Sequence, residues 1–177
     1  SHEDSDSWSL RGNEAIQRGD TRAAIECLGR DLDLTERLRG ETHLLVAAAR
    51  GNLGRLCLQD AWARKSRDAF GIAAGHLERA IEIRRLYLPE TDSYAASLYY
   101  DLGKARREQY DYRSALDAYR RALEIRRSIL VESDLDLGDA YFYCGFVGVE
   151  LGEFDQAAED LLRAAARRRR AHRVPQG

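Results

Sequence analysis

The sequence lacks several features that mark particular classes of protein. It contains no methionine, two prolines and three cysteines among 177 residues, which favours an ordered helical chain. No apolar run reaches the roughly 18–20 residues that a membrane-spanning helix needs, so we expect no membrane partner. The start of the chain is polar and acidic, and no signal peptide is visible there. With no initiator methionine, we expect a segment of a longer protein, with Ser1 and His2 as a cloning remnant.

Cysteine and histidine are scattered along the chain. Cys27, Cys57 and Cys144 lie far apart in apolar contexts, and none of them forms the close pair that a metal site requires. No histidine lies at helical spacing from a cysteine or a carboxylate pair. We therefore expect three buried free thiols in a reducing cytoplasmic environment, with no metal and no cofactor.

Sequence motifs of catalysis are missing. The chain has no glycine-rich phosphate loop, no nucleophile elbow and no paired-carboxylate motif. Its 30 Asp and Glu residues stand at helical spacing from its 28 Lys and Arg residues, which is typical of surface ion pairs. We expect that the chain is not an enzyme, and a catalytic domain elsewhere in a longer protein is left open.

The chain does contain a repeat of 42 residues. The segment 79–85, RAIEIRR, returns at 121–127 as RALEIRR, and a degraded copy begins at Arg163. Small residues extend the pattern to four copies: Gly12, Gly54, Gly103 and Gly145, followed by Ala24, Ala73, Ala115 and Ala157. Seven extra residues near Trp62 interrupt the second copy. We expect them to lengthen two helices whose end the Trp62 indole covers, and Trp62 as a partner anchor is the alternative. A period of roughly 20–50 residues indicates stacked supersecondary units, which favours a binding surface over an active site.

A steric argument connects these small residues to helix packing. Two antiparallel helices approach to about 8–10 Å only where their contact point lacks bulk. We predict that each Gly lies on the first helix of a unit opposite an Ala of the second, flanked by Leu28, Leu77, Tyr119 and Leu161. Eight helices are predicted near 5–18, 21–38, 41–59, 65–87, 92–109, 112–129, 134–151 and 154–172, with tight turns at Gly19 and Gly152 and N-caps at 91–93 and 133–134.

The order of residue types in the third copy resembles the tetratricopeptide repeat. The family's repeat has six characteristic positions in the order aromatic, Leu, Gly, Ala, aromatic and Ala. In the third copy these positions are Tyr99, Leu102, Gly103, Ala115, Tyr119 and Ala122. The units are eight residues longer than the usual 34, and with RALEIRR and an acidic loop they are similar to the kinesin light chain variety, which also occurs in bacterial signalling proteins. The resemblance implies an all-α fold, a right-handed solenoid that forms a single domain over 1–177. Its four units are expected near 5–40, 41–89, 90–131 and 132–173.

The same resemblance implies a binding groove on the concave face, lined by the first helix of each unit. Its positions correspond to Ser9, Asn13, Ile16 and Gln17; Gly51, Arg55, Leu58 and Gln59; Tyr100, Lys104, Arg107 and Glu108; and Phe142, Phe146, Val149 and Glu150. We take Asn13, Gln17, Asn52, Arg55, Gln59, Tyr100, Lys104, Arg107, Phe142 and Phe146 as candidate partner-binding residues. They suit a protein or peptide with an acidic stretch beside an apolar or aromatic anchor.

Structural interpretations of these residues are equally open. Tyr99 and Tyr141 occupy packing positions and are expected in the core, and Tyr100 and Phe142 can belong there too. The cations at 55, 104 and 107 can form a solvated face or neutralise acids such as Asp101 and Glu108. Asn13 and Asn52 match the asparagines of a carboxylate clamp, but Ser9, Ser97 and Asp101 stand where that clamp has cations, so we reject it.

The end of the chain is strongly basic. The segment 161–177 contains six Arg and no acid, so its charge is +6. Since the whole chain has a net charge of −2, residues 1–160 carry −8. The side chains of four consecutive Arg residues are distributed around a helix rather than along one face. This favours the solvated end of a terminal helix over a nucleic-acid-binding surface. A second hypothesis is that the chain is a self-association or sensor domain of a larger regulatory protein. It is motivated by the open ends of a solenoid, which expose apolar surface that a neighbour or another copy must cover. A dimer in the micromolar range would favour it, whereas a monomer favours groove binding.

Overall fold

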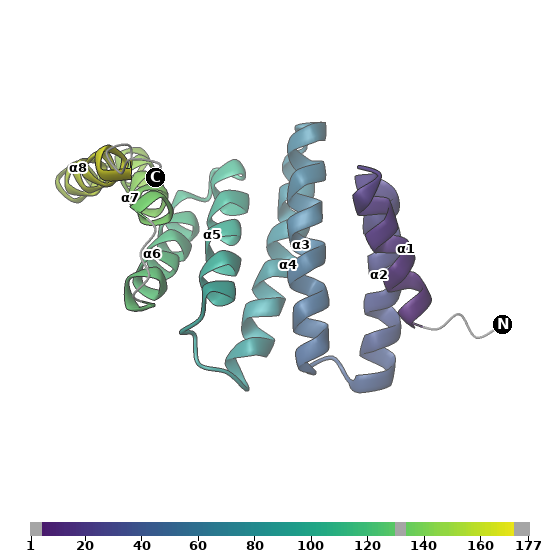
Figure 1. Ribbon diagram of the computed structural model, residues 1–177. Coiled ribbons are helices and arrows are strands. Elements are labelled where there is room, and N and C mark those ends of the chain that lie inside the picture. The colour runs from purple at the N-terminus through teal and green to yellow at the C-terminus, as the bar shows by residue number, and fades with distance from the viewer. Residues whose placement is uncertain (1–4, 130–133, 172–177) are drawn as a thin grey trace, which may run out of the picture. The chain divides into compact units, whose positions relative to one another are not determined.

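The computed structural model describes residues 5–129 and 134–171, and its described regular structure is helical (Figure 1). The helices are α1 (Ser5–Gln17), α2 (Thr21–Arg39), α3 (Leu44–Arg64), α4 (Arg67–Arg85), α5 (Ser93–Glu108), α6 (Tyr112–Ser128), α7 (Asp134–Glu150) and α8 (Phe154–Ala171). They pack in consecutive pairs, α1 on α2, α3 on α4, α5 on α6 and α7 on α8. The predicted all-α fold of eight paired helices is confirmed.

The chain forms two compact units, residues 1–89 and residues 90–177, and each is described by itself. In the first unit α2 also packs on α3, and in the second α6 packs on α7. The alanines of the repeat are buried in both units, with Ala24, Ala73 and Ala115 completely inaccessible and Ala157 1% exposed.

The repeated glycines lie where a side chain would collide with the second helix of the pair. A β-carbon on Gly54 would lie 2.8 Å from Cγ of Leu77, and one on Gly103 would lie 2.7 Å from the Tyr119 ring. Gly12 faces Leu28 and Gly145 faces Leu161 in the same way. The predicted close approach is confirmed, although the nearest atoms belong to the large residue rather than to the alanine side chain.

The seven extra residues of the second copy lengthen α3. The helix continues to Arg64, beyond the predicted end at 59, and α4 begins at Arg67 rather than 65. Good helix formers such as Ala61 and Ala63 carry the helix onward. Trp62 packs edge-on against Phe70 of α4, with ring centroids 6.0 Å apart, so the indole covers the end of this pair as predicted.

Turns within the four pairs share one backbone conformation. Gly19 and Gly152 have φ of 75° and 76°, as expected for tight turns, and Lys65 and Tyr110 adopt the same left-handed region with φ of 51° and 64°. The carboxylate of Asp92 accepts a hydrogen bond from the Ala95 amide at 2.7 Å, which confirms that N-cap. The other predicted N-cap is at 133–134; residue 133 lies outside the described residues, and α7 begins at Asp134.

Two expectations about burial are wrong. Tyr99 is only half-buried: it packs against a core cluster of Ala95, Ala96 and Ile125, and its hydroxyl donates a hydrogen bond to the Glu90 carboxylate. Tyr141 is buried as expected. Cys27 is also half-buried, while Cys57 and Cys144 are buried. Burial raises the pKa of Cys57 to about 11 and that of Cys144 to about 12, so these thiols stay protonated near neutral pH.

Candidate functional site

A pocket of about 700 Å³ opens among α1, α2 and α3 in residues 1–89. Each helix contributes one stripe of residues at the three- and four-residue spacing of a helix face. The stripes are Ser9, Asn13 and Ile16 on α1; Leu28, Asp31 and Thr35 on α2; and Leu45, Ala49, Asn52, Arg55, Leu56 and Gln59 on α3. The pocket therefore offers both amide groups and apolar side chains to a ligand.

All three helices contribute polar groups to the pocket. Nη2 of Arg55 donates to Oδ1 of Asn52 at 2.8 Å, which holds the guanidinium beside the amide and leaves the Asn52 N–H groups as donors. Asp31 lines the α2 wall and is 9% exposed. The two asparagines of the whole sequence, Asn13 and Asn52, both line this pocket.

Residues 90–177 place the remaining aromatic candidates in one packed cluster. Tyr100 is half-buried against the core, and its ring centroid lies 5.6 Å from that of Tyr119 and 5.8 Å from that of Tyr143. Phe142 packs edge-on against Tyr143 at 5.3 Å, and Phe146 stacks on Phe142 at 6.4 Å. Much of this aromatic surface is consequently used in folding.

Two of the cations of α5, Lys104 and Arg107, are paired with acids of the same helix. Nζ of Lys104 lies 2.7 Å from Oδ1 of Asp101, and Nη2 of Arg107 lies 2.5 Å from Oε1 of Glu108. Lys104 also lies over the Tyr100 ring, 4.6 Å from its centroid. The sequence left open whether these cations neutralise nearby acids, and the structure shows that they do. An external carboxylate would have to compete with these pairs.

A protein-family model described as a tetratricopeptide repeat matches residues 95–145. The same paired helices and repeated glycine contacts extend through the described chain. Over residues 95–145 the chain is similar to the tetratricopeptide repeat family. Repeat proteins of this family generally mediate protein–protein interaction and are typically non-catalytic scaffolds.

Similar solved structures include BtubC (BKLC) from P. vanneervenii, with a TM-score of 0.79, 23% identity, and coverage of 98% of this chain and 66% of that one. A kinesin light chain structure with nearly identical TPR-like repeats from Podosopora anserina has a TM-score of 0.71 and 15% identity, covering 96% and 77%. MamA from Desulfovibrio magneticus RS-1 has a TM-score of 0.67 and 18% identity, covering 98% and 78%. A search of curated proteins found no match. These likenesses concern the fold, and the chain spans just under two thirds of the length of BtubC.

The predicted groove residues divide into three groups. Asn13, Asn52, Arg55 and Gln59 line the pocket, whereas Gln17 does not. A third group belongs to the second compact unit and is not part of this lining: Tyr100, Lys104, Arg107, Phe142 and Phe146.

Gly51 and Leu58 were expected in the groove, but both are buried in the packed interior. Since α3 packs against both α2 and α4, the face that includes these two residues is covered. The stripe that contains Asn52, Leu56 and Gln59 faces the pocket instead.

Sequence reasoning missed the α2 wall and part of the α3 stripe. Asp31, Thr35, Leu45, Ala49 and Leu56 line the pocket without having been proposed as binding residues. A signal was present, since 45, 49, 52, 56 and 59 have the period of one helix face. Assigning that face required the packing of α2 on α3, which the repeat spacing does not give.

Two searches of the described residues complete the description of the site. No group of three or more His, Cys, Asp or Glu side chains there is arranged to hold a metal ion. None of the helices described in 5–129 and 134–171 combines the length and the apolar character needed to cross a membrane.

Proposed function

We propose that the pocket of residues 1–89 binds an extended segment of a partner protein. The observation that supports this proposal is the convergence of Asn13, Asn52, Arg55 and Gln59 in one cavity that also has apolar walls. Amide side chains can pair with both the N–H and the C=O groups of an extended backbone. A cavity of about 700 Å³ lies within the usual range of roughly 300–1,000 Å³ for ligand pockets.

Charge in the pocket restricts the partner chemistry. The guanidinium of Arg55 can form two hydrogen bonds to a carboxylate, each worth about 1.5–3 kcal/mol when the acceptor is charged. Asp31 on the α2 wall disfavours a second carboxylate there. The segment should therefore place one Asp or Glu at Arg55.

Apolar side chains complete the recognition. Ile16, Leu45 and Leu56 line the same cavity as Arg55, and burial of apolar surface contributes about 25 cal/mol per Å². Leu45 is 53% exposed and Ile16 is 44% exposed, so a partner can cover them. We propose one apolar anchor residue near the acidic residue of the segment.

The candidates of residues 90–177 enter the proposal as a separate contact. Phe146 is 41% exposed and offers the most accessible ring of the cluster that contains Tyr100 and Phe142. We propose that Phe146 supplies additional apolar contact area to the partner. Lys104 and Arg107 would take part by exchanging their intrahelical carboxylates for those of the partner.

The test begins with peptides of twelve random residues selected for binding to the intact chain, followed by titration calorimetry with one selected peptide. Asn52→Ala and Arg55→Glu should each weaken binding at least tenfold. Arg22→Glu is the matched control, because this exposed arginine of α2 lies outside the pocket lining and should change binding less than twofold. Parent-like affinity in both pocket variants, with helicity confirmed by circular dichroism, would refute the proposal.

A further inference from the structure

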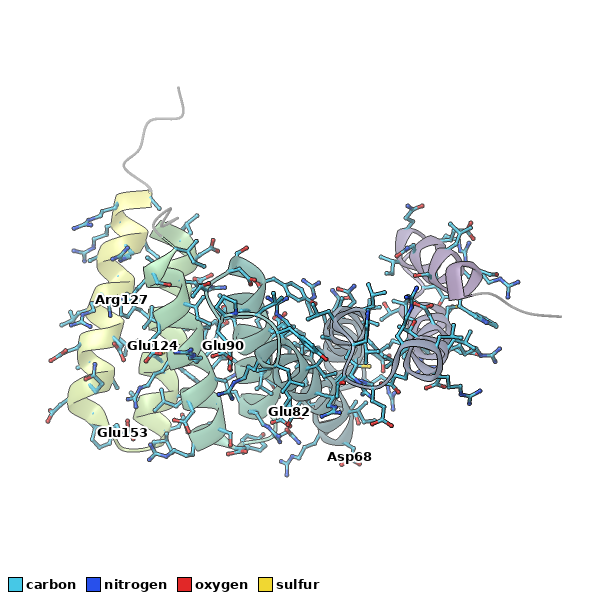
Figure 2. The ribbon with its side chains drawn as sticks, turned by 90° about the horizontal axis from the view of Figure 1, so that it is seen from below. Asp68, Glu82, Glu90, Glu124, Arg127 and Glu153 are labelled. Atoms are coloured by element: carbon cyan, nitrogen blue, oxygen red, sulfur yellow. The ribbon has the colours of Figure 1, made fainter. Side chains whose placement is uncertain are left out.

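A second pocket, of about 420 Å³, lies in residues 90–177 and is lined mainly by arginine. Its residues are Arg127 of α6, Tyr141 of α7, and Arg163, Ala166, Arg167 and Arg170 of α8. Figure 2 labels Arg127, which projects towards α8. Arg163, Arg167 and Arg170 have the spacing of one helix face. The basic end of the chain is a largely exposed helix, and three of its arginines also line this pocket.

The buried ring of Tyr141 positions two of the guanidinium groups. Tyr141 is 4% exposed, and the guanidinium carbons of Arg163 and Arg167 lie 5.7 Å and 5.9 Å from its ring centroid. Cation–π attraction at this distance restrains long side chains that would otherwise sample many rotamers. Because both arginines lie over this ring, the tyrosine is not a free surface on which a nucleobase could stack.

Arg127 and Arg170 carry positive charge that no carboxylate of the described residues neutralises. No carboxylate belongs to the described lining, and Arg127 and Arg170 form no hydrogen bond or ion pair within the described part of the chain. Arg163 lies 3.5 Å from Glu159, but both side chains are more than half exposed, so the pair contributes little. Arg168, which lies on the same helix outside the pocket lining, is by contrast paired with Asp139 at 3.0 Å.

We propose that this arginine pocket binds the phosphoryl group of a phosphorylated Ser or Thr side chain of a partner protein. A phosphoryl group presents three strong acceptor oxygens and a charge of about −1.5 to −2, and guanidinium groups match it with paired hydrogen bonds. Four arginines from two helices can surround one such group. This site is separate from the amide-lined pocket of residues 1–89, and its argument does not depend on the function proposed there.

An extended polyanion fits this surface less well than a compact one. The part of the chain before Leu161 carries a charge of −8, so a long nucleic acid would meet repulsion beyond the pocket. The exposed acids Glu124 and Glu159 lie on α6 and α8, the two helices that supply the arginines. A single phosphoryl group on a protein segment requires only the local positive charge of the pocket.

The experiment uses a library of peptides with one fixed phosphoserine and random flanking residues, compared with the same library carrying serine. Fluorescence anisotropy with one enriched peptide should show at least tenfold tighter binding of the phosphorylated form. Arg167→Gln and Arg170→Gln should remove most of that preference. Arg169→Gln, an exposed residue of the same helix outside the lining, should retain it. Thermal unfolding of each variant checks that α8 remains folded.

Several outcomes would overturn the proposal. One is the absence of any preference for the phosphorylated form, and another is an equal loss in Arg169→Gln. Pocket-dependent binding only to vesicles of one part phosphatidylserine to four parts phosphatidylcholine, or only to single-stranded RNA, would assign the pocket to those ligands instead.

Arg121 forms an ion pair with Glu90. One repeat period of 42 residues later, the corresponding positions are Arg163 and Glu132. A Glu132→Gln variant therefore tests competition from the chain's own carboxylate. Phosphopeptide binding by that variant but not by the parent would also refute the proposal.

Discussion

At the residue scale, four glycines determine how closely the helices of each pair approach. Gly12, Gly54, Gly103 and Gly145 each face a large side chain of the partner helix, and a β-carbon would lie 2.7–2.8 Å from it. Contacts this short force a neighbour to move, and the facing Leu77 and Tyr119 are completely buried. The glycines are thus needed for space rather than for backbone flexibility.

Substitution of two helical glycines in residues 1–89 should have opposite effects. Gly54→Ala should lower the free energy of unfolding by about 1–3 kcal/mol, because the new methyl group overpacks against Leu77. Gly75→Ala is the matched control, since a β-carbon there meets nothing within 4 Å. It should raise the free energy of unfolding by about 0.5–1 kcal/mol through helix propensity. Urea denaturation measures both, and a stabilised Gly54→Ala variant would contradict the packing.

The turn residues give a second comparison at this scale. Gly152→Ala should lower the free energy of unfolding by about 1–2 kcal/mol, because φ of 76° is strained for a residue with a β-carbon. Lys65 already bears that strain with φ of 51°, so Lys65→Gly should not destabilise the chain. Thermal unfolding compares the two variants. Equal destabilisation by both would show that the left-handed conformation is not what matters.

The buried thiols predict a loss of stability in alkaline solution. The pKa of Cys57 is raised to about 11 by burial, with a smaller contribution from Asp60, and that of Cys144 to about 12. Above the unfolded pKa of about 8.5, the unfolded chain releases thiol protons that the folded chain retains, so unfolding becomes more favourable as the pH rises. The Cys57→Ala, Cys144→Ala double variant should lose less stability than the parent between pH 8 and pH 10.5, measured by denaturant titration. Equal losses would contradict the burial of these groups.

At the element scale, the repeat made most helix positions predictable, because each copy repeats the same small and large residues. The end of α3 was missed since the seven extra residues interrupt the period, and good helix formers carry the helix past the expected turn. Part of the pocket was also predictable, because Asn13 and Arg55 follow the family pattern. The α2 wall was not, since it depends on how α2 packs on α3.

One side-chain cluster links three helices of residues 1–89 and should respond to acid. Arg50 of α3 forms hydrogen bonds to Glu36 of α2 at 2.9 Å and 2.5 Å, and its Nη1 lies 3.5 Å from Nδ1 of His76 on α4. Since arginine can only donate, the neutral imidazole accepts at Nδ1. Burial, and then the charge of Arg50, lower the pKa of His76 below its usual value of 6.5.

This lowered pKa gives stability a definite pH dependence. Below about pH 6.5 the unfolded chain binds a proton at His76 that the folded chain resists, so folding is weakened as the pH falls. His76→Gln keeps a hydrogen-bond acceptor but cannot titrate. Its stability relative to the parent should therefore rise between pH 7.5 and pH 5.0 in urea denaturation. Parallel changes in parent and variant would contradict the assignment.

At the scale of the whole molecule, the two compact units present different chemistry for the proposed partners. The pocket of residues 1–89 combines amides, Arg55 and apolar walls, whereas the pocket of residues 90–177 is lined by four arginines. The proposed occupants differ accordingly, an acidic and apolar segment in the first and a phosphoryl group in the second. Variants in one pocket should leave binding at the other unchanged, because the two linings share no residue.

The most direct test of the account is a ¹H–¹⁵N correlation spectrum of the labelled chain with and without a peptide selected for binding. Asn13 and Asn52 are the two asparagines of the sequence and both line the pocket, so their side-chain amide signals report on it specifically. We predict that both amide pairs shift on saturation with the peptide, while those of Gln109 and Gln156 do not. Shifts confined to residues 90–177, with both asparagine signals unmoved, would contradict binding in this pocket.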